Sequence, residues 1–183
     1  MLWIILAIKP ASRGVWLLEN IPVFIFFPLI LWSYFKKQRV SNTSYTLLAI
    51  FMTIHTIGAH YTYSETPFFS ELFGQKLQRD NYDRLAHFSF GLLIIYPLQE
   101  FLRKFIKIGG IWSYFMPLAV LFSISAGYEL FEWGTASLSA PIFADSFLGI
   151  QGDIWDAQKD MLLSLLGALI ALSFIFFKTN KKR

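Results

Sequence analysis

The chain has 183 residues, of which 55% are hydrophobic, 19% aromatic and only 15% charged, with a mean hydropathy of +0.50 and a formal net charge of +4. This composition excludes a disordered chain and argues against an ordinary water-soluble domain, in which about 25% of residues are charged. The absence of cysteine excludes a disulfide scaffold, a zinc ribbon, an iron–sulfur centre and thiol catalysis. We expect a single integral membrane domain over residues 1–183.

The first segment of the chain, Met1–Ile8, is apolar but short. As a helix it would extend about 12 Å, against a hydrocarbon core of about 30 Å. It has neither a charged beginning nor a small-residue cleavage site, so we do not interpret it as a cleavable signal peptide. We expect an interfacial segment or half-helix that ends at Lys9 and Pro10.

Five longer apolar stretches follow, each with roughly the 17–25 residues that a membrane-spanning helix needs. Pro22 and Pro28 should bend the first of them, and Pro97 lies inside the third. A barrel pattern and an internal repeat are both absent from the sequence. The predicted fold class is therefore all-α: a polytopic transmembrane bundle of five spanning helices plus a short N-terminal apolar segment. The expected spans are 15–35, 43–61, 83–105, 111–133 and 156–177.

Basic residues in the short loops predict the orientation of the bundle. They follow the first, third and fifth spans, which places them together on one side: Lys36, Lys37, Arg39, Arg103, Lys104, Lys107, Lys178, Lys181, Lys182 and Arg183. Glu100 is the one acid on that side. We expect this side and the C-terminus to be cytoplasmic and the N-terminus to lie on the outer side. The basic charge thus reflects topology and not a nucleic-acid partner.

Acids and histidines gather where four of the five predicted spans reach the outer side. They are His55 and His60 on the second span, Asp83 and His87 on the third, Glu129 and Glu132 on the fourth, and Asp153, Asp156 and Asp160 at the fifth. The pairs at spacings of three and four share a helix face. Since carboxylates inside a membrane are costly, a bound cation, protons, or Arg84 and Lys159 must compensate them.

Carboxylate oxygens combined with imidazole nitrogens suit a divalent metal ion such as Mn²⁺, Zn²⁺, Fe²⁺ or Mg²⁺. A metal at this position would activate a water molecule or polarise a phosphoryl oxygen. One hypothesis is therefore a metal-dependent enzyme that acts on a lipid or lipid-linked envelope precursor, with membrane lipids as its partners. The expected metal ligands are His55, Asp83, His87, Glu129, Asp153, Asp156 and Asp160, and the expected acid–base residues are His60 and Glu132.

Two alternative hypotheses fit the same residues. The first is a cation- or proton-binding transporter, which is weakened by the lack of an inverted repeat. The second is a non-catalytic membrane component, in which Asp83 and His87 form an intrahelical hydrogen bond and the acids near residue 156 stabilise a helix N-terminus. That capping role does not explain Glu129 and Glu132, because they lie at the C-terminal end of a helix, where the dipole disfavours acids.

Other polar and small residues have structural interpretations. Gly58 marks an expected bend or helix end between His55 and His60. The loops 64–82 and 137–152 are expected to face the outer side and cover the site. Aromatic residues that we expect to anchor the helices at the membrane interface are Tyr61, Tyr63, Trp112, Tyr114, Trp133 and Trp155. Glycines that we expect to allow close helix packing are Gly91, Gly127 and Gly167.

Several long runs resemble the YjdF family of bacterial inner-membrane proteins: WLLENIPVF, HTIGAHYTYSETPF, NYDRLAHFSFGLL, YELFEW and FLGIQGDIWDAQKDM. The resemblance implies a multi-pass protein of the bacterial inner membrane and brings no established reaction. Asp83, His87 and the following Phe88, then Glu129 and an acidic run that ends at Asp160, are more distantly similar to VanZ-like membrane proteins. VanZ-like proteins usually carry an asparagine within that run, and the similarity implies a related architecture and a link to the cell envelope.

Overall fold

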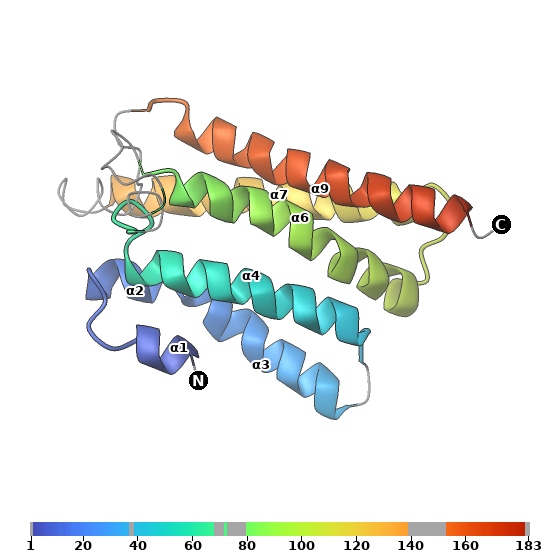
Figure 1. Ribbon diagram of the computed structural model, residues 1–183, viewed down its shortest axis with the longest axis horizontal. Coiled ribbons are helices and arrows are strands. Elements are labelled where there is room, and N and C mark those ends of the chain that lie inside the picture. Colours follow the sequence, from blue (N-terminus) through green and yellow to red (C-terminus); the bar gives the residue numbers. More distant parts are fainter. Residues whose placement is uncertain (1, 37–38, 68–71, 73–79, 139–152, 182–183) are drawn as a thin grey trace.

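The structure is a computed structural model that describes residues 2–36, 39–67, 72, 80–138 and 153–181. All the regular elements among these residues are helices, which confirms the predicted all-α class. The long helices lie roughly along one common direction and alternate in sense along the chain (Figure 1). In chain order they are α1 (Leu2–Leu6), α2 (Arg13–Glu19), α3 (Ile21–Phe35), α4 (Asn42–His60), α6 (Tyr82–Phe101) with the π-helical turn η1 (Leu102–Ile106), α7 (Trp112–Ser137) and α9 (Asp156–Asn180).

Within the described residues, three helical stretches are long and apolar enough to cross a membrane: Tyr82–Ile106, Trp112–Ser137 and Asp156–Thr179. Helices α2 and α3 add a fourth if they are one span bent by 41°. Helix α4 has 19 residues but is less apolar, since it carries several threonines and two histidines. A multi-pass helical bundle is therefore confirmed, whereas the predicted count of five spans is not.

The first predicted span is broken at Asn20, two residues before Pro22, where a bend was expected. Asn20 is fully buried and stabilises the break with both ends of its amide. Its Nδ2 donates to the carbonyl oxygen of Trp16 at 2.7 Å, and its Oδ1 accepts from Nε1 of Trp3 at 2.7 Å. The short N-terminal helix is thereby held against the bundle, and Glu19 is placed in the interior, where only 2% of its surface is exposed.

Helices α6 and α9 form the closest pair of the bundle, because glycines let their backbones approach. A Cβ on Gly91 would lie 1.8 Å from the carbonyl oxygen of Ser164, and one on Gly167 would lie 2.3 Å from that of Phe88. The expected packing role is therefore confirmed for these two glycines. It is wrong for Gly127, around which a Cβ would meet nothing within 4 Å.

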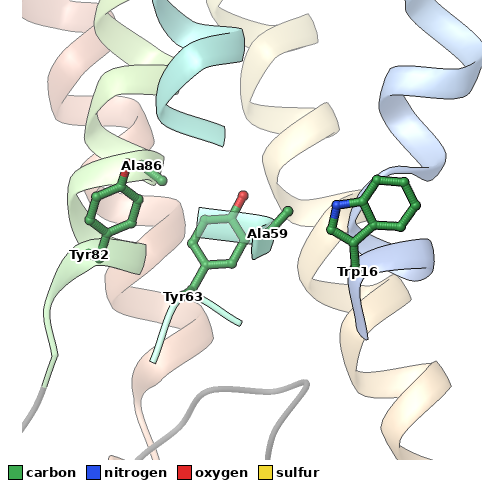
Figure 2. Packing of buried hydrophobic residues seen from close by; sticks show 5 residues of the cluster. All are labelled: Trp16, Ala59, Tyr63, Tyr82 and Ala86. Carbon is green, nitrogen blue, oxygen red and sulfur yellow. The ribbon is translucent and has the colours of Figure 1, made fainter. Parts of the chain in front are cut away.

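A cluster of buried side chains joins α2, α4 with the turn that follows it, and α6. Its members are Trp16, Ala59, Tyr63, Tyr82 and Ala86 (Figure 2). The expectation that Tyr63 is an interfacial anchor is wrong, because its side chain points into this cluster and only 7% of it is exposed.

Space for the Tyr63 ring comes from Gly58, on which a Cβ would lie 2.3 Å from Cε1 of Tyr63. The expected bend or end at Gly58 is also wrong, since α4 continues through it to His60. Three of the expected anchors, Trp112, Trp133 and Trp155, are 58–65% exposed, as an interfacial position requires.

Candidate functional site

The polar helix ends predicted to converge lie at one end of the bundle. Helices α4 and α7 end there, and α6 and α9 begin there, with α2 beside them (Figure 1). Most of the two loops expected to cover this end, residues 68–71, 73–79 and 139–152, lies outside the described residues. The candidate site is therefore built from the helix ends themselves.

The centre of the site is formed by Asp83 and His87 of α6 and Asp160 of α9. Each offers one ligand atom, and these atoms lie within 4.8 Å of one another. His87 Nε2 is 3.6 Å from Asp83 Oδ1 and 3.4 Å from Glu129 Oε1. Hydrogen bonds of this type are shorter, about 2.7–3.2 Å. Both separations are those of ion pairs between a carboxylate and a protonated histidine, and they also fall below the roughly 4.2 Å that is the largest separation of two ligand atoms each about 2.1 Å from one ion.

Two carboxylates of this group are buried with an oxygen that has no hydrogen-bond partner. Asp160 is 2% exposed and its Oδ1 is unpartnered; Glu129 is 8% exposed and its Oε1 is unpartnered. No lysine or arginine among the described residues forms an ion pair with either carboxylate. An uncompensated buried charge is among the costliest features of a protein interior, so a proton or a bound cation must neutralise these carboxylates.

Two serines orient the histidine. Ser164 Oγ donates to the carbonyl oxygen of His87 at 3.1 Å and lies 3.5 Å from its Nδ1, which leaves Nε2 to face the acids. Ser125 of α7 in turn donates to Ser164 at 3.1 Å. The His87 ring therefore has its Nδ1 edge toward Ser164 and its Nε2 edge toward Asp83 and Glu129. Sequence reasoning missed both serines; their spacing on apolar helices beside predicted ligands was the available signal.

Asp153 and Asp156, which lie outside the central group, have basic partners. Arg84 pairs with Asp153 and lies 3.7 Å from Asp156, and Lys159 Nζ is 2.6 Å from Asp153. The hydrogen bond from Lys159 is the main reason that the pKa of Asp153 is lowered to about 2. Helix α9 begins at Asp156, so Asp153 precedes the helix and does not share one helical stripe with Asp160.

The structure does not bring the two histidines of α4 into the central group. His55 uses both ring nitrogens elsewhere: Nδ1 lies 2.6 Å from the Tyr63 hydroxyl and Nε2 lies 3.0 Å from the carbonyl oxygen of Glu19. His60 directs Nδ1 to the carbonyl oxygen of Leu6 at 2.8 Å. Both histidines therefore connect α4 to neighbouring segments.

A second buried acidic group adjoins the first. Tyr128 donates a hydrogen bond to the carboxylate of Glu19, and its ring centroid is 6.4 Å from that of His87. Glu132 lies near enough to Glu19 and Asp83 to interact electrostatically with both. This places the predicted acid–base residue Glu132 beside the centre, together with Glu19 and Tyr128, which were not among the predicted site residues.

The comparisons with known proteins agree with the expected family. Residues 1–181 match the family described as "Predicted membrane protein (DUF2238)". Over 172 residues the chain is 37% identical to inner membrane protein YjdF of Escherichia coli (strain K12), covering 92% of this chain and 80% of that protein. No solved structure matches the chain. These matches confirm the resemblance to YjdF and, with the spanning helices, support a multi-pass location in the inner membrane.

Proposed function

The chain belongs to the DUF2238 family of membrane proteins, and we propose that it is a divalent-metal-dependent enzyme whose metal lies between the polar ends of α6, α7 and α9. Asp83, His87 and Asp160 are the proposed ligands, and Glu129 is the fourth. The observation that carries the proposal is the buried, unpartnered oxygen of Asp160 beside two other ligating side chains.

The ligand set supports a metal of intermediate hardness. Three carboxylates and one imidazole suit Mn²⁺, Fe²⁺, Zn²⁺ or Mg²⁺, and such an ion supplies a Lewis acid or an activated water when bound. Glu132 is the proposed acid–base residue, since it lies beside the centre and is half-buried. His60 has no such role in this proposal, because its Nδ1 faces the carbonyl oxygen of Leu6.

The arrangement favours an enzyme over a transporter. Beyond the site, Ile95, Leu121, Ala168 and Leu172 pack as a buried apolar cluster in the middle of the bundle. A transported ion would need polar groups along that route. We propose instead that substrate reaches the site from the polar end, which the loop charges predict to face the periplasm. A lipid or lipid-linked envelope precursor is the proposed substrate class, because the site lies where spanning helices end at the membrane surface.

Metal analysis of the full chain purified in detergent tests the proposal. We expect close to one bound divalent ion per chain, lost in Asp160→Asn and Asp83→Asn. Asp153→Asn is the matched control and should keep the ion, since Asp153 already pairs with Arg84 and Lys159. Absence of stoichiometric metal in the wild type, together with no metal-dependent change in thermal stability, would contradict the proposal.

A second measurement separates an enzyme from a structural metal site. The metal-loaded protein is incubated with a total polar lipid extract, and consumed and newly formed lipids are quantified by mass spectrometry. We expect turnover with the wild type and none with Glu132→Gln, provided that this variant still binds metal. Metal binding without any turnover would favour the non-catalytic alternative.

A further inference from the structure

A polar groove lies at the opposite end of the bundle from the acidic site. It has a volume of about 600 Å³ and runs between α6, η1 and α9. Its walls include Tyr96, Arg103, Lys104, Lys178 and Thr179. Helices α6 and α9 touch closely at Gly91 and Gly167, whereas the groove lies between them here.

Two of the basic side chains in this groove have no counter-ion. Arg103 and Lys178 form no hydrogen bond or ion pair with any described residue, and both are exposed. The ammonium group of Lys104 donates a hydrogen bond to the carbonyl oxygen of Arg39. The groove, which Tyr96 also lines, therefore presents unneutralised positive charge.

Glu100, the one acid among the residues that line the groove, is hydrogen-bonded to residues outside it. The carboxylate of Glu100 accepts hydrogen bonds from the backbone N–H of Ser41 at 2.8 Å, from Ser41 Oγ at 2.7 Å and from Ser44. These bonds tie Glu100 to the first turn of α4. Glu100 is also close to Lys104, whose charge offsets its own. The net charge that faces the groove is thus the charge of Arg103 and Lys178.

The backbone at this groove departs from a regular helix. Residues Leu102–Ile106 form a π-helical turn, which ends at Lys107 in the left-handed conformation with φ of 62°. Such turns are rare and are found frequently at functional sites. Here the turn carries Arg103 and Lys104 at the rim of the groove.

We propose that this groove binds the phosphate of an anionic phospholipid headgroup. Arg103 lies near the end of the span Tyr82–Ile106 and Lys178 near the end of the span Asp156–Thr179, so both lie at the depth of lipid headgroups. Basic pockets between spanning helices are suited to acidic headgroups. A lipid source is favoured over a soluble anion because the groove opens between two helices whose neighbouring surfaces are apolar. The proposal does not depend on the metal site.

Native mass spectrometry of the full chain, titrated with phosphatidylglycerol or phosphatidylcholine, tests it. We expect tighter binding of phosphatidylglycerol, and a loss of about 30-fold in its affinity in the double variant Arg103→Gln, Lys178→Gln, because each basic residue near an anionic lipid contributes about fivefold. Lys36→Gln is the matched control: Lys36 is a basic residue of the same end that does not line the groove, and its replacement should leave the affinity unchanged.

The possible results distinguish the alternatives. Equal binding of the two lipids by the wild type, or full affinity for phosphatidylglycerol in the double variant, would overturn the proposal. Displacement of phosphatidylglycerol by excess inorganic phosphate would overturn the lipid assignment in favour of a soluble anion. If the double variant does not fold, Lys178→Gln alone, at the exposed end of α9, should still lose about fivefold in affinity.

Discussion

The contact between α6 and α9 can be tested by replacing Gly91 with alanine. The added Cβ would lie 1.8 Å from the carbonyl oxygen of Ser164 and 2.9 Å from the backbone nitrogen of Ala168. Both neighbours are backbone atoms, so no side-chain rotation relieves the overlap and the two helices must separate. Because the Ser164 hydroxyl donates to the carbonyl oxygen of His87, the separation also reaches the polar site.

The expected cost follows from two opposing effects. Overpacking of a close contact typically costs about 1–3 kcal/mol. The cost at Gly91 should lie at the upper end of this range, because the added Cβ would lie 1.8 Å from a backbone oxygen, whereas real Cβ contacts are essentially never shorter than 3.0 Å. Alanine recovers up to about 1 kcal/mol over glycine as a helix former. We therefore expect Gly91→Ala to lower the free energy of unfolding by about 2 kcal/mol.

Reversible unfolding of the full chain in mixed micelles measures this difference. Gly127→Ala is the matched control, because a Cβ at Gly127 meets nothing within 4 Å. The control should be unchanged or up to about 1 kcal/mol more stable. Unchanged stability in Gly91→Ala, or an equal loss in both variants, would refute the close-packing argument.

Three further predictions concern polar side chains. Glu129→Gln should lower the affinity for a divalent ion by at least the roughly 10–100-fold that loss of a group supporting a ligand costs, as measured by competition with a chelator, because it removes a charged oxygen 3.4 Å from His87 Nε2; unchanged affinity would exclude Glu129 as a ligand. Tyr63→Phe should cost about 1–3 kcal/mol in chemical unfolding, since it leaves His55 Nδ1 without its partner at 2.6 Å. The ion pair between Asp153 and Lys159 should stabilise the fold fully above the ordinary pKa of 3.8, and this contribution should disappear as the pH falls through about 2. The thermal stability of Asp153→Asn should therefore approach that of the wild type on acidification, and a constant difference would contradict this assignment.

The helix ends were largely predictable because apolar length and charge define them. The predicted spans 43–61 and 156–177 correspond to Asn42–His60 and Asp156–Asn180. The break at Asn20 was only partly predictable: Pro22 signals a bend, but the amide contacts that stabilise the break come from Trp3 and Trp16. A sequence pattern does not reveal such contacts between segments.

The polar end was predictable as a region but not in its internal pairing. The spacing of Asp83 and His87 indicated one face of a helix, and the structure places Asp160 of another helix against them. His55 was predicted as a ligand because it lies toward the same outer end of the bundle. The residue is instead held by Tyr63 and by the backbone of Glu19. Spacing along one helix identifies shared faces, whereas the partner across the bundle depends on the helix arrangement.

The way in which charge is compensated along α9 argues against a purely structural role for the acids. Asp153 precedes the helix and pairs with Arg84 and Lys159, and Asp156 at its first turn still lies 3.7 Å from Arg84. Asp160, one turn deeper and 2% exposed, has an oxygen with no hydrogen-bond partner. If these acids served only to cap the helix, the deepest should be the best compensated, because the cost of a buried charge increases with depth. The observed order is the reverse, which is the order expected if a proton or the cation that we propose neutralises Asp160.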